Sequence, residues 1–143
     1  MLFLATDHAG FELKEELAHL LADRGVTFED FGAFSLQPSD DFPQYAKKVA
    51  HAVIKHNGKG ILLCGSGQGV CIAANRFAGI RAAVAWNKEV VQKAREDDDV
   101  NILCLPARFI SPTTAWEIVS TFLSTTFSHQ DRYKRRIKQI DEN

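Results

Sequence analysis

The sequence contains little of what marks disulfide-stapled, zinc-bound or nucleic-acid-binding proteins. Its three cysteines, Cys64, Cys71 and Cys104, form no Cys-x-x-Cys pair, which argues against a disulfide framework and against structural zinc. The 17 basic and 18 acidic side chains give a formal net charge of -1, whereas nucleic-acid-binding proteins usually carry a strong basic excess. We therefore expect no nucleic-acid partner.

Long apolar runs are also missing. Charged residues interrupt the hydrophobic stretches before they reach the ~20 residues that a membrane-spanning helix requires. Residues 1–7 lack the basic region and the extended apolar core of a signal peptide. These absences predict a soluble cytoplasmic protein with reduced cysteines and no membrane partner.

The apolar residues that are present switch repeatedly between strand-like and helix-like spacing. Short apolar or alternating runs predict strands at 2–6, 26–31, 60–64, 80–86 and 102–105. Helical spacing predicts helices at 10–24, 43–54, 70–76, 88–96 and 111–123, with Asn87 and Ser111 as N-caps and one more helix in the basic tail. The alternation predicts one three-layer α/β domain over residues 1–143, in which helices cover both faces of five parallel strands.

Chemically useful side chains follow three of the predicted strands. Asp7 and His8 follow the first strand, Cys64 ends the third, and Arg108 follows the fifth. Ligands of an open parallel sheet bind beyond the carboxyl ends of its strands. We therefore expect a carboxylate, an imidazole, a thiol and a guanidinium to gather on one rim of the sheet.

The segment Gly65-Ser66-Gly67-Gln68-Gly69 joins the third strand to a helix. Its glycines allow backbone N–H groups to approach an anion closely. The third glycine comes one residue too early for the dinucleotide-binding fingerprint, and the Lys-Ser/Thr of a P-loop is missing. Taken alone, the pattern fits a phosphate cradle and a plain strand-to-helix turn equally well.

Several of these residues also have purely structural interpretations. A thiolate at the start of a helix can accept a proton, yet Cys64 can equally be a small buried hydrophobe, as we interpret Cys71 and Cys104. Asp7 suits the N-cap of the following helix, and His8 suits a surface position. Arg132 and Arg136 lie one helical turn apart and can grip a phosphate together, although such basic runs are usually solvated.

In combination, these motifs resemble those of the type-B ribose-5-phosphate isomerases, a family that includes the galactose-6-phosphate isomerase subunits. The matching segments span nearly the whole chain. They are Asp7-His8-Ala9-Gly10, Asp41-Phe42-Pro43-Gln44-Tyr45-Ala46, residues 60–69, residues 72–76, residues 78–82, Asn101-Ile102-Leu103, Arg108, Arg132 and Arg136. The stretch from Cys64 to Arg81 is the most specific part.

The resemblance implies interconversion of ribose 5-phosphate and ribulose 5-phosphate through a cis-enediolate, without a metal or an organic cofactor. It makes Cys64 the base that moves the proton. Ser66 and the backbone of Gly65 to Gly69 would stabilise the enediolate oxygens. Asp7 would bind sugar hydroxyls and assist ring opening, and Tyr45 would line the pocket.

The resemblance also implies a shared site. His8, Arg108, Arg132 and Arg136 would hold the phosphate, the two tail arginines reaching the site of a neighbouring subunit. The expected assembly is therefore a homodimer with shared active sites, or a tetramer built from it.

Two positions separate this chain from other members of the family. Val70 stands just after the glycine turn, where the branch with a glutamate base carries that residue. Asp97-Asp98 stands where the family usually has His-Asn, whose histidine opens the sugar ring. Either Asp97 replaces that histidine, another group opens the ring, or the substrate is a tetrose phosphate, which stays linear; residues 96–99 can also be a solvated helix end.

Three further functions remain open at the level of sequence. The chain can isomerise a tetrose or hexose phosphate, or act as a non-catalytic sugar-phosphate sensor, which the exchange at Asp97 suggests. A flavodoxin-like nucleotide-binding module ranks behind both, because no aromatic pair flanks the glycine turn.

Overall fold

A computed structural model describes residues 1–142. It has a five-stranded sheet in the order β2-β1-β3-β5-β4, and neighbouring strands pair in parallel. The strands are β1 (Leu2–Thr6), β2 (Phe28–Asp30), β3 (Lys59–Cys64), β4 (Ala82–Val84) and β5 (Ile102–Pro106). The sequence predicted this parallel α/β sheet, and the structure confirms it.

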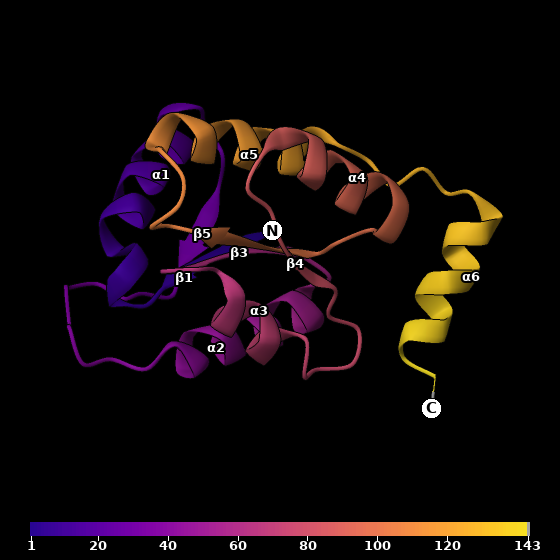
Figure 1. Cartoon of the computed structure of the whole chain (residues 1–143), viewed down its shortest axis with the longest axis horizontal. Helices are drawn as coiled ribbons and strands as arrows, with labels where there is room; N and C mark the ends of the chain where they lie inside the picture. Colours follow the sequence, from indigo (N-terminus) through magenta and orange to yellow (C-terminus); the bar gives the residue numbers. More distant parts are fainter. Residues whose placement is uncertain (143) are drawn as a thin grey trace.

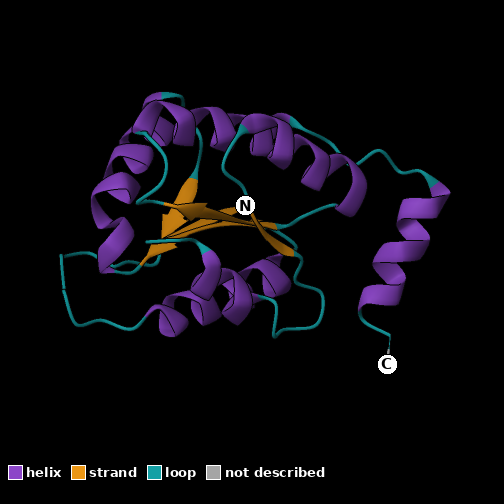
Figure 2. Cartoon of the chain, in the orientation of Figure 1, coloured by secondary structure: helices purple, strands orange, loops and turns teal. Residues whose placement is uncertain are grey.

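Helices cover both faces of the sheet (Figures 1 and 2). The helices are α1 (Phe11–Asp23), α2 (Phe42–His56), α3 (Gln68–Ala74), α4 (Lys88–Asp98), α5 (Pro112–Ser124) and α6 (Asp131–Ile140), with a short 3-10 turn at His8–Gly10. Helices α1, α4 and α5 lie on one face and α2 and α3 on the other, whereas α6 stands beside α4 (Figure 1). None of the helices within residues 1–142 has the length and apolar character needed to cross a bilayer.

Each central strand sends alternate side chains into two separate cores, because successive side chains of a strand point to opposite faces. Leu4, Ile61 and Leu103 are in register and pack in the core shared with α1, α4 and α5. Leu62 belongs to the second core, beneath α2 and α3. Cys64 also belongs to that second core, so its thiol points to the α2–α3 side of the sheet.

The predicted boundaries are wrong mainly at the two edge strands. Residues 26–31 and 80–86 were expected to be strands, but only Phe28–Asp30 and Ala82–Val84 pair, each with a single neighbour. Helix α3 begins at Gln68, two residues before its predicted start, and α4 continues to Asp98, two residues beyond its predicted end. The N-caps are confirmed: Asn87 accepts a hydrogen bond from the N–H of Val90, and Ser111 from that of Thr114.

A buried lysine anchors the loop that leads from β2 towards the rim. The Lys14 side chain is fully buried, and its Nζ donates to Asp30 Oδ2 at 2.6 Å and to the Ala33 carbonyl at 2.8 Å. The backbone of this loop also pairs with β1, since the Ala33 N–H donates to the Thr6 carbonyl at 2.8 Å. The loop therefore starts from a fixed position beside the end of β1.

Candidate active site

A cavity of about 390 Å³ opens at the carboxyl ends of β1, β3 and β5. Strand β2 lies on one side of β1, and the next strand along the chain, β3, lies on the other side. The strand order therefore reverses beside β1, and the cavity lies at this switch point, where such sheets bind ligands. Its lining residues are Asp7, His8, Ala9, Phe42, Cys64, Gly65, Ser66, Gly69, Arg108 and Phe109. The expected carboxylate, imidazole, thiol and guanidinium therefore do meet on one rim.

Cys64 is 5% exposed, and that small exposed part faces the cavity. The N–H of Gly67 donates to its sulfur at 3.1 Å. A hydrogen bond of this kind is stronger when the acceptor carries negative charge. Gly67 has a φ of 74°, a conformation that glycine adopts without strain, so the turn depends on this residue to aim its N–H at the thiol.

The glycine turn lets two neighbours approach the cavity. A Cβ at Gly65 would lie 3.0 Å from Nη1 of Arg108, and one at Gly69 would lie 2.7 Å from the ring of Phe42. Ser66 lines the cavity, and its Oγ accepts from the N–H of Gln68 at 3.3 Å. Gly67 and Gln68 do not line the cavity themselves; they shape the turn behind it.

Asp7 caps the turn after β1 and also lines the cavity. Its Oδ1 accepts from the N–H of Ala9 at 3.0 Å and so caps the turn after β1. The residue is only 6% exposed and still lines the cavity. Burial raises the pKa of Asp7 above its usual value, against the lowering effect of the Ala9 hydrogen bond.

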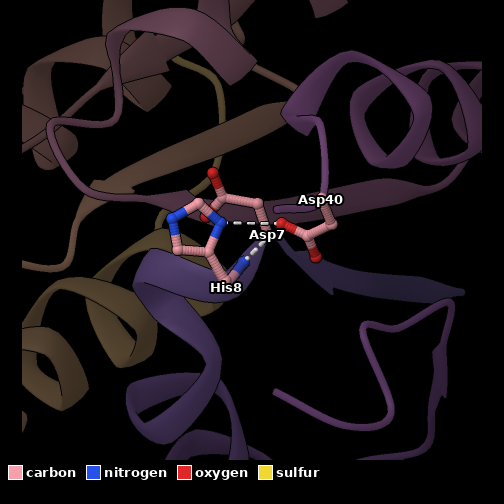
Figure 3. A group of neighbouring side chains, drawn as sticks. All are labelled: Asp7, His8 and Asp40. Carbon is pink, nitrogen blue, oxygen red and sulfur yellow. Dashed lines mark hydrogen bonds and ion pairs between the residues drawn. The ribbon is translucent and has the colours of Figure 1, made fainter. Parts of the chain in front are cut away.

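The carboxylate of Asp40 contacts two residues of the expected site, His8 and Tyr45, and Figure 3 shows its contacts with His8. Its Oδ1 accepts from the backbone N–H of His8 at 3.0 Å and lies 2.8 Å from Nδ1 of the same residue. Its Oδ2 accepts from the hydroxyl of Tyr45 at 3.0 Å. Burial opposes ionisation, but the hydrogen bonds from His8 and Tyr45 outweigh it and hold the pKa of Asp40 below its usual value.

The position of Tyr45 corrects one expectation. Tyr45 was expected to line the pocket, but its 8% exposed side chain lies behind the cavity wall in the α2 core. Burial raises the pKa of its hydroxyl, and the hydrogen bond to Asp40 adds to this rise. The contact of Tyr45 with the site is therefore indirect, through Asp40.

Ligand atoms of Asp7, His8 and Asp40 lie within 4.8 Å of one another, the only such group of potential metal ligands in residues 1–142. Two of the candidate ligand atoms, Nδ1 of His8 and Oδ1 of Asp40, are hydrogen-bonded to each other (Figure 3). Hydrogen bonding accounts for this arrangement without an ion.

The two tail arginines lie away from the cavity. Arg132 and Arg136 belong to α6, which contacts α4 and contributes nothing to the cavity lining. The guanidinium of Arg132 lies 4.7 Å from the centre of the Tyr133 ring and donates to its hydroxyl at 2.9 Å. Within one chain, the basic groups at the cavity are therefore His8 and Arg108.

Asp97 and Asp98 are the last two residues of α4, at the opposite edge of the sheet from Cys64. The carbonyl of Asp98 accepts from Nε of Arg81 at 2.9 Å, and Arg81 directly precedes β4. Val70 is fully buried in the core. Neither aspartate reaches the cavity of its own chain.

The other two cysteines are structural. Cys104 is fully buried, and burial raises the pKa of its thiol well above the usual value. Cys71 is half-buried, and its thiol donates to the Ala82 carbonyl at 3.3 Å. All three cysteines are free thiols.

The predicted site residues did not include four residues found at the site, namely Ala9, Asp40, Phe42 and Phe109. Asp40 lies in a loop with no periodic pattern, and only its place just before the predicted α2 hinted at the rim. Phe42 and Phe109 line the cavity, and Phe109 is 75% exposed. Its position directly after Arg108 was the available signal.

A larger cavity, of about 450 Å³, lies at the amino ends of the strands and includes Lys59, Arg81, Arg95 and Asp99. Arg81 and Arg95 both pair with the carboxylate of Asp99, at 3.3 and 2.8 Å. It contains no thiol or imidazole, so the smaller cavity is the candidate active site.

Comparisons with known proteins identify the family of the chain. The sequence profile of the family described as Ribose/Galactose Isomerase matches residues 2–140. The chain is 39% identical over 140 residues to a probable ribose-5-phosphate isomerase B of Mycoplasma pneumoniae, covering 97% of this chain and 91% of that protein. It is 39% identical to ribose-5-phosphate isomerase B of Escherichia coli over 135 residues, 94% of this chain and 89% of that protein.

Solved structures give the same result. The ribose 5-phosphate isomerase of Thermotoga maritima superposes with a TM-score of 0.96 at 46% identity, covering 99% of this chain and 97% of that one. The Mycoplasma genitalium enzyme, solved with bound ribulose-5-phosphate, gives 0.93 at 37% identity, covering 97% and 92%. A parallel α/β sheet with this rim is the scaffold of a sugar-phosphate isomerase. The chain belongs to the ribose/galactose isomerase family, among the type-B ribose-5-phosphate isomerases.

Proposed function

We propose that the chain interconverts ribose 5-phosphate and ribulose 5-phosphate, with residues 1–143 acting as one catalytic domain and Cys64 as its base. One observation carries the proposal: the thiol of Cys64 faces a cavity that also presents Asp7, Ser66, His8 and Arg108. The proposal is supported by the relatives, several of which are named ribose-5-phosphate isomerase B.

The proton transfer follows from the position of the thiol. The Cys64 thiolate removes the proton from C2 of the open-chain aldehyde, and the electrons of that bond form the C1–C2 double bond of an enediolate. A proton then moves from O2 to O1, and the Cys64 thiol returns its proton to C1, which leaves the ketone at C2. No redox partner is needed, because the substrate is oxidised at C2 and reduced at C1.

The surroundings of the thiol suit this step. The N–H of Gly67 contacts the sulfur at 3.1 Å and stabilises negative charge there before the proton arrives. Ser66, at the cavity wall, supplies a hydroxyl for an enediolate oxygen. Asp7 binds sugar hydroxyls and gives or takes a proton during ring opening, a role that its raised pKa favours.

The phosphate end of the substrate lies at His8 and Arg108 in this proposal. The exposed guanidinium of Arg108 lies against Gly65 at the mouth of the cavity, where it forms paired hydrogen bonds with phosphate oxygens. The distance from Cys64 to this basic end is set by the strands β3 and β5, whose ends are joined by the hydrogen bond from the Ala107 N–H to the Cys64 carbonyl.

The site is completed by a second copy of the chain. Helix α6 buries none of its side chains, although Arg132 and Arg136 lie one turn apart on it. Ile72, Trp86 and Ile140 are exposed apolar side chains on α3, after β4 and on α6. A homodimer in which each tail reaches the partner's cavity would bury these surfaces and bring the two arginines to the phosphate.

Mixing two inactive variants tests the shared site. Cys64→Ala and the double variant Arg132→Gln/Arg136→Gln are each expected to be inactive alone. After refolding together, mixed dimers contain one site with an intact thiol and an intact pair of arginines, so part of the activity returns. Absence of any recovery, with mixed dimers demonstrated by mass spectrometry, would show that the arginines do not complete the site of the partner chain.

Isotope exchange tests the reaction itself. In deuterated water containing EDTA, the wild-type protein should convert ribose 5-phosphate to the ketose and incorporate deuterium at the transferred position. Cys64→Ala should lose both reactions and keep its affinity for the sugar phosphate. Tight binding without exchange in the wild type would instead identify a sugar-phosphate sensor.

A second candidate is an isomerase of a tetrose phosphate, and Asp97 is the observation that favours it. A linear tetrose phosphate needs no ring-opening histidine, which this chain lacks at that position. Initial rates with four-, five- and six-carbon aldose phosphates separate the two candidates directly.

A further inference from the structure

Asp40 is a part-buried residue beside the site, and the reaction described above does not use its carboxylate. Its side chain is 7% exposed and lies in the loop before α2. Carboxylates are rarely buried unless they are paired. Asp40 is paired three times, and two of the three donors belong to His8.

The contact with Asp40 determines which nitrogen of the His8 ring carries a hydrogen. An ionised carboxylate only accepts hydrogen bonds, so the 2.8 Å contact requires a hydrogen on Nδ1. The same oxygen also accepts from the His8 backbone N–H, which fixes the ring relative to its own main chain. The second ring nitrogen, Nε2, lies on the side of the ring away from Asp40 (Figure 3).

We propose that Asp40 is a positioning residue that holds His8 so that Nε2 meets the phosphate group of the substrate. The His8 ring then lies between two anionic groups, with Nδ1 at Asp40 and Nε2 at the phosphate. Preorganisation of this kind removes the rotamer entropy that a free histidine would lose on binding. The inference rests on the proposed function only for its ligand, a sugar phosphate.

The fold does not need Asp40 to hold this loop. Lys14 anchors the loop at Asp30 and Ala33, and the Ala33 N–H pairs with β1. Tyr45 is held by the α2 core, in which its ring is buried. Replacement of Asp40 should therefore change the freedom of His8 and leave the path of the chain in place.

A double-mutant cycle tests whether Asp40 acts through His8. The dissociation constants of inorganic phosphate and of ribitol 5-phosphate, which cannot isomerise, are measured by calorimetry for wild type, Asp40→Asn, His8→Gln and the double variant. Asp40→Asn should weaken ribitol 5-phosphate binding about 10-fold, a change typical of coupled charged neighbours. In the His8→Gln background the same replacement should have no further effect.

Matched controls separate this role from a structural one. Asp23→Asn removes the same charge from an exposed position at the end of α1 and should leave binding unchanged. Tyr45→Phe removes one donor but leaves both His8 contacts, so it should weaken binding far less than Asp40→Asn. Nitrogen-15 spectra of the His8 ring should show a hydrogen on Nδ1 in the wild type and mixed tautomers in Asp40→Asn.

Kinetics provide the last readout. Asp40→Asn should raise KM for the substrate and leave kcat nearly unchanged, because the contact is to a phosphate that does not react. Additive losses in the cycle, or a fall in kcat alone, would overturn the positioning role. A wild type that binds ribitol 5-phosphate with the predicted coupling but isomerises nothing would defeat the proposed function and leave this inference standing.

Discussion

The amino ends of the strands form one edge of the sheet, the amino edge, and their carboxyl ends form the other, the carboxyl edge. The two edges hold similar numbers of charged groups but use them differently. At the amino edge, Arg95 is 4% exposed, and its guanidinium donates hydrogen bonds to Asp99, Val100 and Thr125. At the carboxyl edge, Arg108 is exposed at the cavity mouth, and Cys64 faces the same space with a single N–H donor. A cavity whose charges satisfy one another stabilises the fold, and a cavity whose groups remain available can bind a ligand.

Arg95→Met is the substitution with the largest expected effect on the amino edge. It removes the partner of a carboxylate and of two backbone carbonyls, and breaking a buried pair costs about 3–5 kcal/mol. Urea unfolding should show this loss, whereas kcat/KM per folded molecule should stay within about twofold of wild type. A large fall in activity without a fall in stability would remove the distinction between the edges.

Arg108→Gln is the counterpart at the carboxyl edge. The exposed guanidinium supports little of the fold, so the free energy of unfolding should change by no more than about 0.5 kcal/mol. Loss of a paired contact to phosphate should raise KM about 10- to 100-fold, equivalent to about 1.4–2.8 kcal/mol of binding. Arg24→Gln, an exposed arginine beside Trp116, is the matched control and should leave KM unchanged.

The same contrast explains what the sequence could predict. Short, continuous apolar runs such as residues 60–64 predicted the central strands, because burial on both faces leaves a strong pattern. The edge strands were overestimated because an apolar residue such as Trp86 can lie in an exposed loop, here 57% exposed. Motifs at strand ends predicted Asp7, His8, Cys64 and Arg108 at one rim.

Tertiary contacts supplied what the sequence could not. Asp40 and His8 are 32 residues apart, and the anchoring of the intervening loop by Lys14 and by backbone pairing with β1 helps to bring them together. Tyr45 was assigned to the pocket from the resemblance, but it lies behind the cavity wall and contacts the site only through its hydrogen bond to Asp40. The tail arginines need a second copy of the chain, which no pattern within one chain can position.

Asp97→His tests whether a residue at the amino edge of one chain contributes to the active site at the carboxyl edge of its partner. Within a chain, Asp97 lies across the sheet from Cys64, so any effect on catalysis must pass through a neighbour. If ring opening limits the rate with ribose 5-phosphate, the histidine should raise kcat several-fold, as general acid–base groups do. The rate with a linear tetrose phosphate should not change, and equal changes with both substrates would exclude ring opening as the limiting step.

Asp7→Asn distinguishes the two carboxylates of the site by the sign of their effects on stability. The raised pKa of Asp7 means that its ionised form is less favourable in the folded than in the unfolded protein. The ionised carboxylate therefore costs stability above its folded pKa, and this cost disappears as the pH falls through that value towards the unfolded one. Asp40 has the opposite sign, since its lowered pKa stabilises the fold at neutral pH and this contribution is lost in acid.

Thermal unfolding across pH measures both signs. Asp7→Asn should be more stable than wild type by about 1 kcal/mol at neutral pH, with the gain vanishing near pH 4, and it should lose most of its activity. Asp40→Asn should be less stable at neutral pH, and its deficit should shrink in acid. If both replacements destabilised the protein equally at every pH, the carboxyl edge would be a structural cluster like that around Arg95. Asp7 would then not be a carboxylate whose ionisation costs stability and which is retained for its chemistry.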